Sequence, residues 1–393
     1  MVDLDKTGFC MVNGLLRRRI GKCSVGAKFF LIRFVQIYGT GMEVALSVKV
    51  LAQEVGVTDR VASDAIQQLV ALGLLSQEST GGKPGRPSSS YMCVMETLAV
   101  KLKLGEGVGQ KSMHSDSINQ LLHGVRHRES ERLHYANRLL LAVLLVHADE
   151  FGAVRELGLR DLSDLTGLKK AVLHQRLVKL QDQCFIRVTV PGVTGRALFK
   201  LTKSLYILNL GHPMLQVQFG PYPLVLRNAR NTYPARSIFV AARISKNGPL
   251  NLGHGSYVLG GLFEAQNSAR LVPMLQSTID GYASFLLSKH FDALAQNISE
   301  FNELLERIRL DFEHLGEKIV GSSSDQNNPG NLTLLLHAEA VTWAKQIMTA
   351  IKETPHLCGG TFKYMLLPPS QRFSAEAGCW ALLVIPAETS LLR

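Results

Sequence analysis

The chain has 393 residues, of which 46% are hydrophobic and 19% are charged, and its formal net charge is +11. An apolar fraction of this size can build hydrophobic cores, so a wholly disordered, collagen-like or low-complexity chain is excluded. The best candidate for a membrane-spanning helix, residues 139–146, is far shorter than the roughly 20 apolar residues that such a helix needs. Because the first residues also lack the pattern of a signal peptide, we expect a cytoplasmic bacterial protein with no membrane partner.

Cysteine and histidine spacing gives no support for a metal site. The six cysteines lie far apart without any CxxC pair, which argues against a zinc ribbon and a disulfide framework. His123 and His127 have helical HxxxH spacing, but no acidic or thiol ligand lies beside them in the sequence. The sequence also lacks a Walker loop, HExxH and GxSxG. We therefore expect no catalytic residue, no metal and no cofactor, and we do not expect an enzyme.

Positive charge is concentrated in the first half of the chain. Residues 1–210 carry 28 Lys and Arg against 18 Asp and Glu, whereas residues 211–393 carry 15 against 14. A charge asymmetry of this kind indicates an anionic partner for the first half, such as nucleic acid or a membrane surface.

The first half contains an internal repeat at an offset of 111 positions. Without gaps, this shift aligns Gly41 with Gly152, Gly56 with Gly167, and a series of apolar residues between and after them. Chance readily matches apolar residues with each other, but it does not readily match two glycines in one ungapped stretch. The alignment therefore predicts one supersecondary unit that is used twice.

The hydrophobic pattern predicts the elements of that unit. Gly56 is suited to the left-handed turn that ends a helix, and Thr58 offers a hydroxyl that can cap the next one. The first copy is expected to contain a helix at 27–38 (138–149 in the second copy), an extended segment at 44–48, helices at 49–55 and 59–72, a strand starting at 74, a basic tip at 78–88 and a returning strand at 90–94.

This order of elements resembles the winged helix-turn-helix of the MarR/GntR-like superfamily. The segments GVTDRVASDAIQQLVALGLL and GLKKAVLHQRLVKLQDQCFI are similar to its turn, recognition helix and first wing strand. KPGRPSSSY is similar to its wing, in which a Gly-Arg-Pro tip precedes an aromatic residue. The resemblance covers roughly residues 25–98 and 130–210.

The resemblance implies double-stranded DNA as the partner, with the start of each second helix in the major groove. The residues to which it assigns DNA contacts are Thr58, Asp59, Arg60, Ser63 and Gln67 in the first copy, Lys169, Lys170, His174, Gln175 and Lys179 in the second, and Lys83, Arg86 and Arg196 in the wings. Asp59 and Asp64 would repel phosphate. The second copy is therefore expected to supply most of the affinity, while the first reads bases or contacts a protein.

The remaining segments complete an expected fold that is mainly α with small β wings: two winged helix-turn-helix domains followed by a mostly helical C-terminal α+β domain. Six apolar residues near the C-terminal domain's centre recur at 4,3,4,3,4 spacing, which suits either pairing with another chain as a homodimer or protein complex, or a core face. These are Phe301, Leu305, Ile308, Phe312, Leu315 and Ile319. The expected organisation is a basic N-terminal arm at 1–24, domains at 25–98 and 131–210, a linker at 99–130, an irregular connector at 211–260 with one strand at 237–244, and a helical domain at 261–393.

These features predict a sequence-specific DNA-binding protein that acts as a transcriptional regulator. One alternative is a replication initiator or maintenance protein of a plasmid, genomic island or integrative conjugative element. Tandem winged helices with a larger extra domain also resemble such replication initiators. Another is a scaffold whose winged helices dock proteins.

Overall fold

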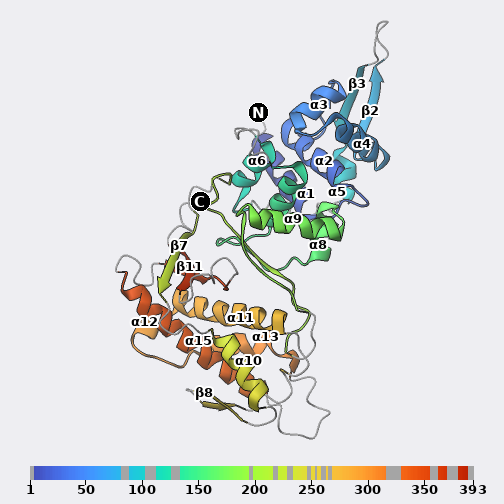
Figure 1. Ribbon diagram of the computed structural model, residues 1–393. Coiled ribbons are helices and arrows are strands. Elements are labelled where there is room, and N and C mark those ends of the chain that lie inside the picture. Colours follow the sequence, from blue (N-terminus) through green and yellow to red (C-terminus); the bar gives the residue numbers. More distant parts are fainter. Residues whose placement is uncertain are drawn as a thin grey trace. The chain divides into compact units, whose positions relative to one another are not determined.

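The computed structural model of the chain is a mainly helical α+β structure with small three-stranded sheets (Figure 1), as the sequence predicts at that level. The structure describes residues 4–80, 88–101, 112–124, 133–193, 198–215, 220–227, 233–245, 249–252, 255–257, 263, 268–315, 329–354, 362–369 and 379–387. Its contacts divide the chain into two compact units, which are described separately. The first unit comprises residues 1–187 and 208–219, and the second comprises residues 188–207 and 220–393, so the boundary runs through two strands.

The first copy of the repeat has the elements that its sequence predicts. They are α2 (Val25–Tyr38), β1 (Glu43–Val44), α3 (Val48–Val55), α4 (Asp59–Ala71), β2 (Leu75–Thr80) and β3 (Ser88–Cys93). The three strands form an antiparallel sheet in the order β1-β3-β2, with Gln77 opposite Tyr91. Thr58 caps α4 as expected, because its hydroxyl accepts a hydrogen bond from the Val61 amide at 3.4 Å.

The second copy repeats this order. Its elements are α7 (Tyr135–Val146), β4 (Ala153–Val154), α8 (Leu159–Thr166), α9 (Lys170–Asp182), β5 (Ile186–Val190) and β6 (Leu205–Leu208). The sheet order β4-β6-β5 corresponds to β1-β3-β2. Adding 111 to the bounds of α3 and α4 gives the bounds of α8 and α9, so the structure confirms the repeat. Between β5 and β6, an isolated antiparallel bridge joins Val193 and Thr202.

Left-handed backbone positions also coincide at this offset. Gly56 and Gly167 end α3 and α8 with φ of 81° and 74°. After α4, Gly73 has φ 65°, and the Leu74 amide bonds to the Leu69 carbonyl. After α9, Cys184 takes the place of Gly73 with φ 62°, and the Phe185 amide bonds to the Leu180 carbonyl. The same helix-ending turn therefore forms twice, although a cysteine is unfavourable in it.

Replacing Cys184 by glycine is expected to raise the free energy of unfolding of the first unit by about 0.5–1 kcal/mol. Relief of the left-handed strain of about 1–2 kcal/mol is partly offset by the greater entropy of unfolded glycine. Urea unfolding followed by circular dichroism measures the change. Gly73→Ala, at the equivalent position, should change stability in the opposite direction, and a destabilised Cys184→Gly protein would contradict the prediction.

The segment expected to be a basic arm, 1–24, contains helix α1 (Leu4–Arg17) instead. Its residues Met11, Val12, Leu15 and Leu16 are buried, and α1 contacts α2 and α7, so this helix belongs to the core of the first unit. The expected linker at 99–130 likewise contains a helix, α6 (Ser115–His123), which packs on α7. The end of helix α5 (Met95–Lys101) also falls within the expected linker. Both segments are helical because their apolar faces pack on α2 or α7, which lie far away along the chain.

The strand expected at 237–244 is wrong, because this segment lies in helix α10 (Pro234–Ser245). Its buried residues Ile238, Phe239 and Ala242 follow helical spacing, and a short apolar run alone does not distinguish a strand from a helix. The expected connector also contains β7 (Tyr222–Arg227), β8 (Leu250–Leu252) and β9 (Gly255–Tyr257).

The rest of the second unit is built on α11 (Ser268–Lys289) and α15 (Pro329–Lys352), with α12 (Phe291–Ala295) and α13 (Asn302–Asp311) packed on α15. Strands β10 (Phe362–Leu366) and β11 (Cys379–Pro386) pair antiparallel and form a sheet in the order β10-β11-β7. The outer edge of β10 is covered by α11, since the Ser288 and Ser284 hydroxyls accept hydrogen bonds from the Tyr364 and Leu366 amides at 2.8 and 2.9 Å.

The apolar series with heptad-like spacing forms a core face, which is one of its two predicted roles. Phe301, Ile308, Phe312 and Leu315 are buried within the second unit, Leu305 is half-buried, and Ile319 lies outside the described residues. The α13 helix also ends at Asp311, so the series does not follow one continuous helix. The four buried side chains are occupied by packing inside the chain, which contradicts the expected oligomerisation seam at these positions.

Among the described residues, no helix has both the length and the apolar character required to cross a membrane.

Candidate nucleic-acid interface

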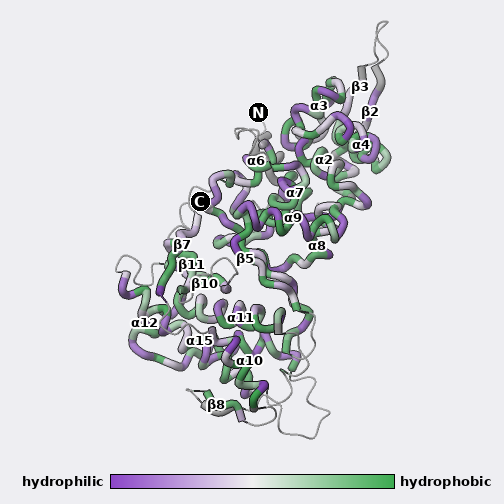
Figure 2. Tube along the Cα trace, viewed as in Figure 1, coloured by the Kyte–Doolittle hydropathy of each residue, from purple (hydrophilic) through white to green (hydrophobic). Residues whose placement is uncertain are grey.

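The candidate residues of the second copy lie together on the outer face of α9. Its inward face is apolar, since Leu173, Leu177 and Leu180 are buried. The side chains that project outward are all exposed: Lys169, Lys170, His174, Gln175 and Lys179. Figure 2 shows hydrophilic and hydrophobic residues alternating along this helix. Amphipathic spacing therefore directs the polar and basic side chains outward.

These basic side chains remain available for an external partner. Within the described part of the chain, no ion pair or hydrogen bond engages the side chains of Lys169, Lys170 or Lys179. Lys169 occupies the N-cap position and makes no side-chain capping bond. Lys169 and Lys170 lie together at the start of α9, and Lys179 lies about two and a half turns further along, so ammonium groups flank the exposed side of this helix at both ends. This arrangement favours binding of an anionic surface.

The candidate residues of the first copy lie on the outer face of α4. Asp59, Arg60 and Gln67 are exposed, Ser63 is half-exposed, and Thr58 is exposed at the cap. Asp64 is exposed on the same helix, so this face carries two acids and one cation. The acids make α4 less suited to phosphate contacts than α9.

The wing candidates Lys83, Arg86 and Arg196 lie outside the described residues, as does His127 of the HxxxH pair. Among the described residues, no group of three or more His, Cys, Asp or Glu side chains is arranged so that it could hold a metal ion.

Buried helices from the two copies fix the positions of α4 and α9 within the first unit. Helices α2 and α7 contact each other, and α1 packs against both. Every residue from Gly26 to Val35 in α2 and from Ala136 to Val146 in α7 is buried. The rings of Phe29 and Tyr135 lie 5.7 Å apart at this contact. The two copies therefore share one hydrophobic core.

Two buried cations of α2 tie this core to both helix pairs. Arg33 donates hydrogen bonds to the Glu54 and Val55 carbonyls in the last turn of α3, at 3.1 and 3.4 Å. Lys28 donates to the Arg18 carbonyl at 2.7 Å and also to the Leu165 carbonyl in the last turn of α8. Both cations lie at the negative ends of helix dipoles. Burial lowers the pKa of Lys28 to about 7, which reflects how deeply its ammonium group is enclosed.

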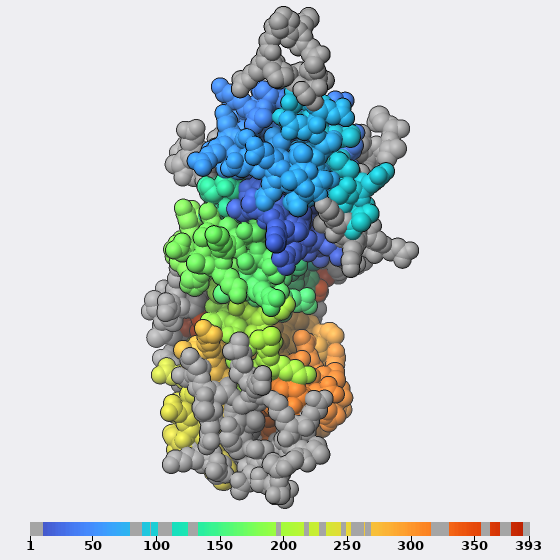
Figure 3. All heavy atoms as spheres, turned by 90° about the vertical axis from the view of Figure 1, so that its right-hand side faces the viewer, coloured from blue at the N-terminus to red at the C-terminus, as the bar shows by residue number. Residues whose placement is uncertain are grey.

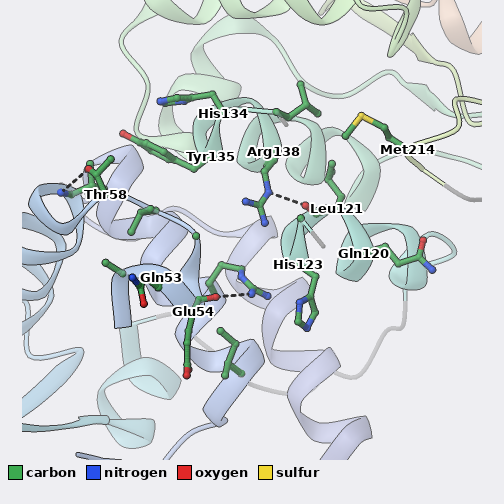
Figure 4. Close-up of a pocket in the computed structure, with 18 residues that line it drawn as sticks. Gln53, Glu54, Thr58, Gln120, Leu121, His123, His134, Tyr135, Arg138 and Met214 are labelled. Atoms are coloured by element: carbon green, nitrogen blue, oxygen red, sulfur yellow. Dashed lines mark hydrogen bonds between the residues drawn. The ribbon is translucent and has the colours of Figure 1, made fainter. Parts of the chain in front are cut away.

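A pocket of about 1030 Å³ lies in the first unit beside the start of α4 (Figure 4). Its lining includes Thr58, His123, His134 and Arg138. The Arg138 guanidinium donates from Nε to the Leu121 carbonyl at 2.9 Å and lies 5.0 Å from the centre of the Phe29 ring. Burial first, and then the nearby guanidinium groups, lower the pKa of His123. The arginine on the pocket wall is thus already used to join α6 and α7.

The sequence did not single out several residues that hold α4 and α9 in place. Arg176 lies on α9 but reaches inward, where it donates to the Asn137 side-chain oxygen of α7 at 2.7 Å. Gln68 on α4 bonds to the backbone of Lys22 and Ser24. No sequence motif marks these contacts, because they connect residues that are distant in the chain.

Comparison with known protein families matches none of their models to this chain. A comparison with curated proteins likewise finds no significant match.

Proposed function

We propose that both copies are winged helix-turn-helix modules and that the first unit binds double-stranded DNA. The supporting pattern is the order helix, strand, helix, helix, strand, strand, which occurs twice with the same sheet order. In this arrangement the second helix of each pair, α4 or α9, is the one that enters the major groove.

The observation that carries the proposal is the composition of the exposed face of α9. An α-helix fits the width of the major groove, where Lys can bond to guanine and Gln to adenine. Lys170, His174 and Gln175 are exposed near the start of the helix, and Lys169 precedes them. Helix α9 is thus suited to both phosphate and base contacts. Helix α4, with its two exposed acids, is better suited to a few base contacts through Arg60 and Gln67.

Replacing Lys169 and Lys170 by alanine is expected to weaken DNA binding by about 10-fold or more at low salt. Two lost phosphate contacts should also make the plot of log affinity against log salt concentration shallower by about 2, since each contact contributes about 0.9. Fluorescence anisotropy of a labelled random-sequence duplex of 40 base pairs, titrated between 50 and 200 mM NaCl, measures both quantities.

The matched control replaces Arg236 and Lys352, which are exposed on the second unit, by alanine. It removes the same charge and should leave the salt dependence unchanged. If the α9 pair and the control bind alike, α9 is not the DNA-binding helix. If the native chain does not bind duplex DNA at all, protein docking becomes the function to pursue.

The role that we propose for DNA binding is transcriptional regulation. Selection of bound fragments from a complete bacterial genome, with the purified full chain, tests this role. Fragments that cluster at promoters support it. Fragments that carry iterated direct repeats at a replication origin would instead favour a replication initiator.

A further inference from the structure

We propose that the end of α1 and the turn that follows it form a third DNA-contacting element, which binds backbone phosphates between α4 and α9. We call this segment, residues 17–22, the basic bridge. It carries four cations, Arg17, Arg18, Arg19 and Lys22. The inference rests on the proposed function and specifies which surface of the first unit follows the DNA backbone.

The basic bridge is attached to α4 on one side. The Gln68 side-chain amide donates to the Lys22 carbonyl at 3.1 Å, and its oxygen accepts from the Ser24 amide at 3.0 Å. Gln68 is adjacent in sequence to Gln67, which is exposed on the proposed reading face of α4. Because consecutive helical residues point about 100° apart, Lys22 is held against the flank of α4 that adjoins this face.

The same turn is attached to the second copy on its other side. Arg19 forms an ion pair with Asp164 of α8 at 3.6 Å, and the buried Lys28 links the Arg18 carbonyl to the Leu165 carbonyl. After the turn, the backbone of Cys23 approaches Gly167 so closely that a Cβ atom on this glycine would lie 2.5 Å from the Cys23 oxygen. Gly167 is only two residues before Lys169, so the turn ends beside the start of α9.

The basic bridge presents its charges outward from a fixed backbone. All four cationic side chains are exposed, whereas Ile20 and Cys23 are buried and anchor the turn. In the described part of the chain, the side chains of Arg17, Arg18 and Lys22 have no acidic partner. Figure 3 shows the dark-blue N-terminal segment on the same face as the blue first copy and the green second copy.

The positive charge of the basic bridge suits it to bind DNA phosphates. Phosphates flank the major groove on both sides, and contacts to them fix the register of a protein on the duplex without reading sequence. Helix α4 carries two exposed acids and cannot by itself continue the cationic surface of α9. The basic bridge supplies the missing positive charge between them, and its fixed backbone reduces the entropy lost on binding.

The test replaces Arg17, Arg18 and Lys22 together by glutamine and leaves Arg19 with its partner Asp164. Binding of the labelled random-sequence 40-base-pair duplex is titrated between 50 and 200 mM NaCl. Loss of up to three phosphate contacts should make the log–log salt dependence shallower by about 2–3, with affinity lower by about 10- to 100-fold at low salt. The control triple Arg236→Gln, Arg270→Gln and Lys352→Gln, all exposed on the second unit, should behave like the native chain.

A second measurement does not depend on affinity. An Arg18→Cys protein labelled with an azidophenacyl group should cross-link to the duplex on irradiation, whereas an Arg236→Cys protein labelled in the same way should not. If Lys169→Ala with Lys170→Ala weakens binding but the bridge triple binds like the native chain and position 18 does not cross-link, the bridge inference is overturned and the proposed function stands. If the native chain fails to bind duplex DNA, both are overturned.

Discussion

Replacing Gly167 by alanine is expected to lower the free energy of unfolding of the first unit by about 2–5 kcal/mol. Two costs add together. Gly167 has φ 74°, and an L-residue in the left-handed region costs about 1–2 kcal/mol. A methyl group there would also lie 2.5 Å from the Cys23 oxygen and 3.0 Å from the Val25 nitrogen. Because both neighbours are backbone atoms, relief requires the two segments to separate, at a cost of about 1–3 kcal/mol.

The repeat provides a matched control for this variant. Gly56 ends α3 as Gly167 ends α8, with φ 81°, but its added Cβ would meet only the Arg138 side-chain tip at 3.4 Å. Gly56→Ala should therefore incur only the left-handed cost of about 1–2 kcal/mol. Urea unfolding followed by circular dichroism compares the two. Equal losses in both variants would show that the approach of Gly167 to Cys23 does not matter.

Replacing Asp280 by asparagine is expected to stabilise the second unit above pH 7. Asp280 is 2% exposed, and its Oδ1 accepts hydrogen bonds from Gln276 at 2.8 Å and Trp343 at 3.0 Å. Its Oδ2 is buried with no hydrogen-bond partner in the described part of the chain. Burial raises the pKa of Asp280 from 3.8 to about 7, although the two hydrogen bonds act in the opposite direction. Asparagine keeps the acceptor oxygen and removes the buried charge.

The direction of the pH dependence follows from this raised pKa. Below pH 3.8 the carboxyl is protonated in both the folded and the unfolded chain, so it contributes no penalty. Between pH 3.8 and about 7 the unfolded chain loses the proton while the folded chain keeps it, and stability falls as pH rises. The accumulated penalty corresponds to about 4 kcal/mol, at about 1.4 kcal/mol for each pH unit of that interval.

Tryptophan fluorescence measures this effect selectively. The chain has two tryptophans, Trp343 and Trp380, and both lie in the second unit. The difference in unfolding free energy between Asp280→Asn and the native chain should be small near pH 4, grow until about pH 7 and then remain constant. His337, whose pKa is lowered by burial, destabilises both proteins at low pH and cancels in the difference.

Asp292→Asn, at an exposed position on α12, is the control for a change of charge. It should leave the pH dependence of the native chain unchanged. A difference between Asp280→Asn and the native chain that does not vary with pH would show that Asp280 stays charged in the folded protein.

The repeat illustrates which structure local sequence can predict. Gly56 and Gly167 mark the ends of α3 and α8, Thr58 caps α4, and apolar spacing defines the inward faces of α4 and α9. Each of these signals acts within a few residues along the chain, so it survives in the sequence pattern. The outward positions on α9 follow from the same spacing, and for that reason its candidate residues were found.

The errors occurred where distant packing decides conformation. Residues 237–244 form a helix, because α11 buries one helical face of an apolar run that by itself suits either structure. The N-terminal segment forms helix α1, because it packs on both α2 and α7. These two helices belong to different copies of the repeat and lie far apart in the sequence. Four of the residues with heptad-like spacing are buried inside the second unit, since a 4,3 pattern fits any apolar surface that covers a helix.

By itself the sequence determined that a unit of helices and strands occurs twice, where its turns fall, and that positive charge gathers in the first half. Tertiary structure alone decided that α2 and α7 form a shared core and that residues 17–22 lie between α4 and α8. The physical reason is that caps, turns and helical faces depend on neighbours a few positions away. The contacts of Lys28 with Leu165 and of Gly167 with Cys23 join segments more than 130 residues apart, and no local pattern encodes them.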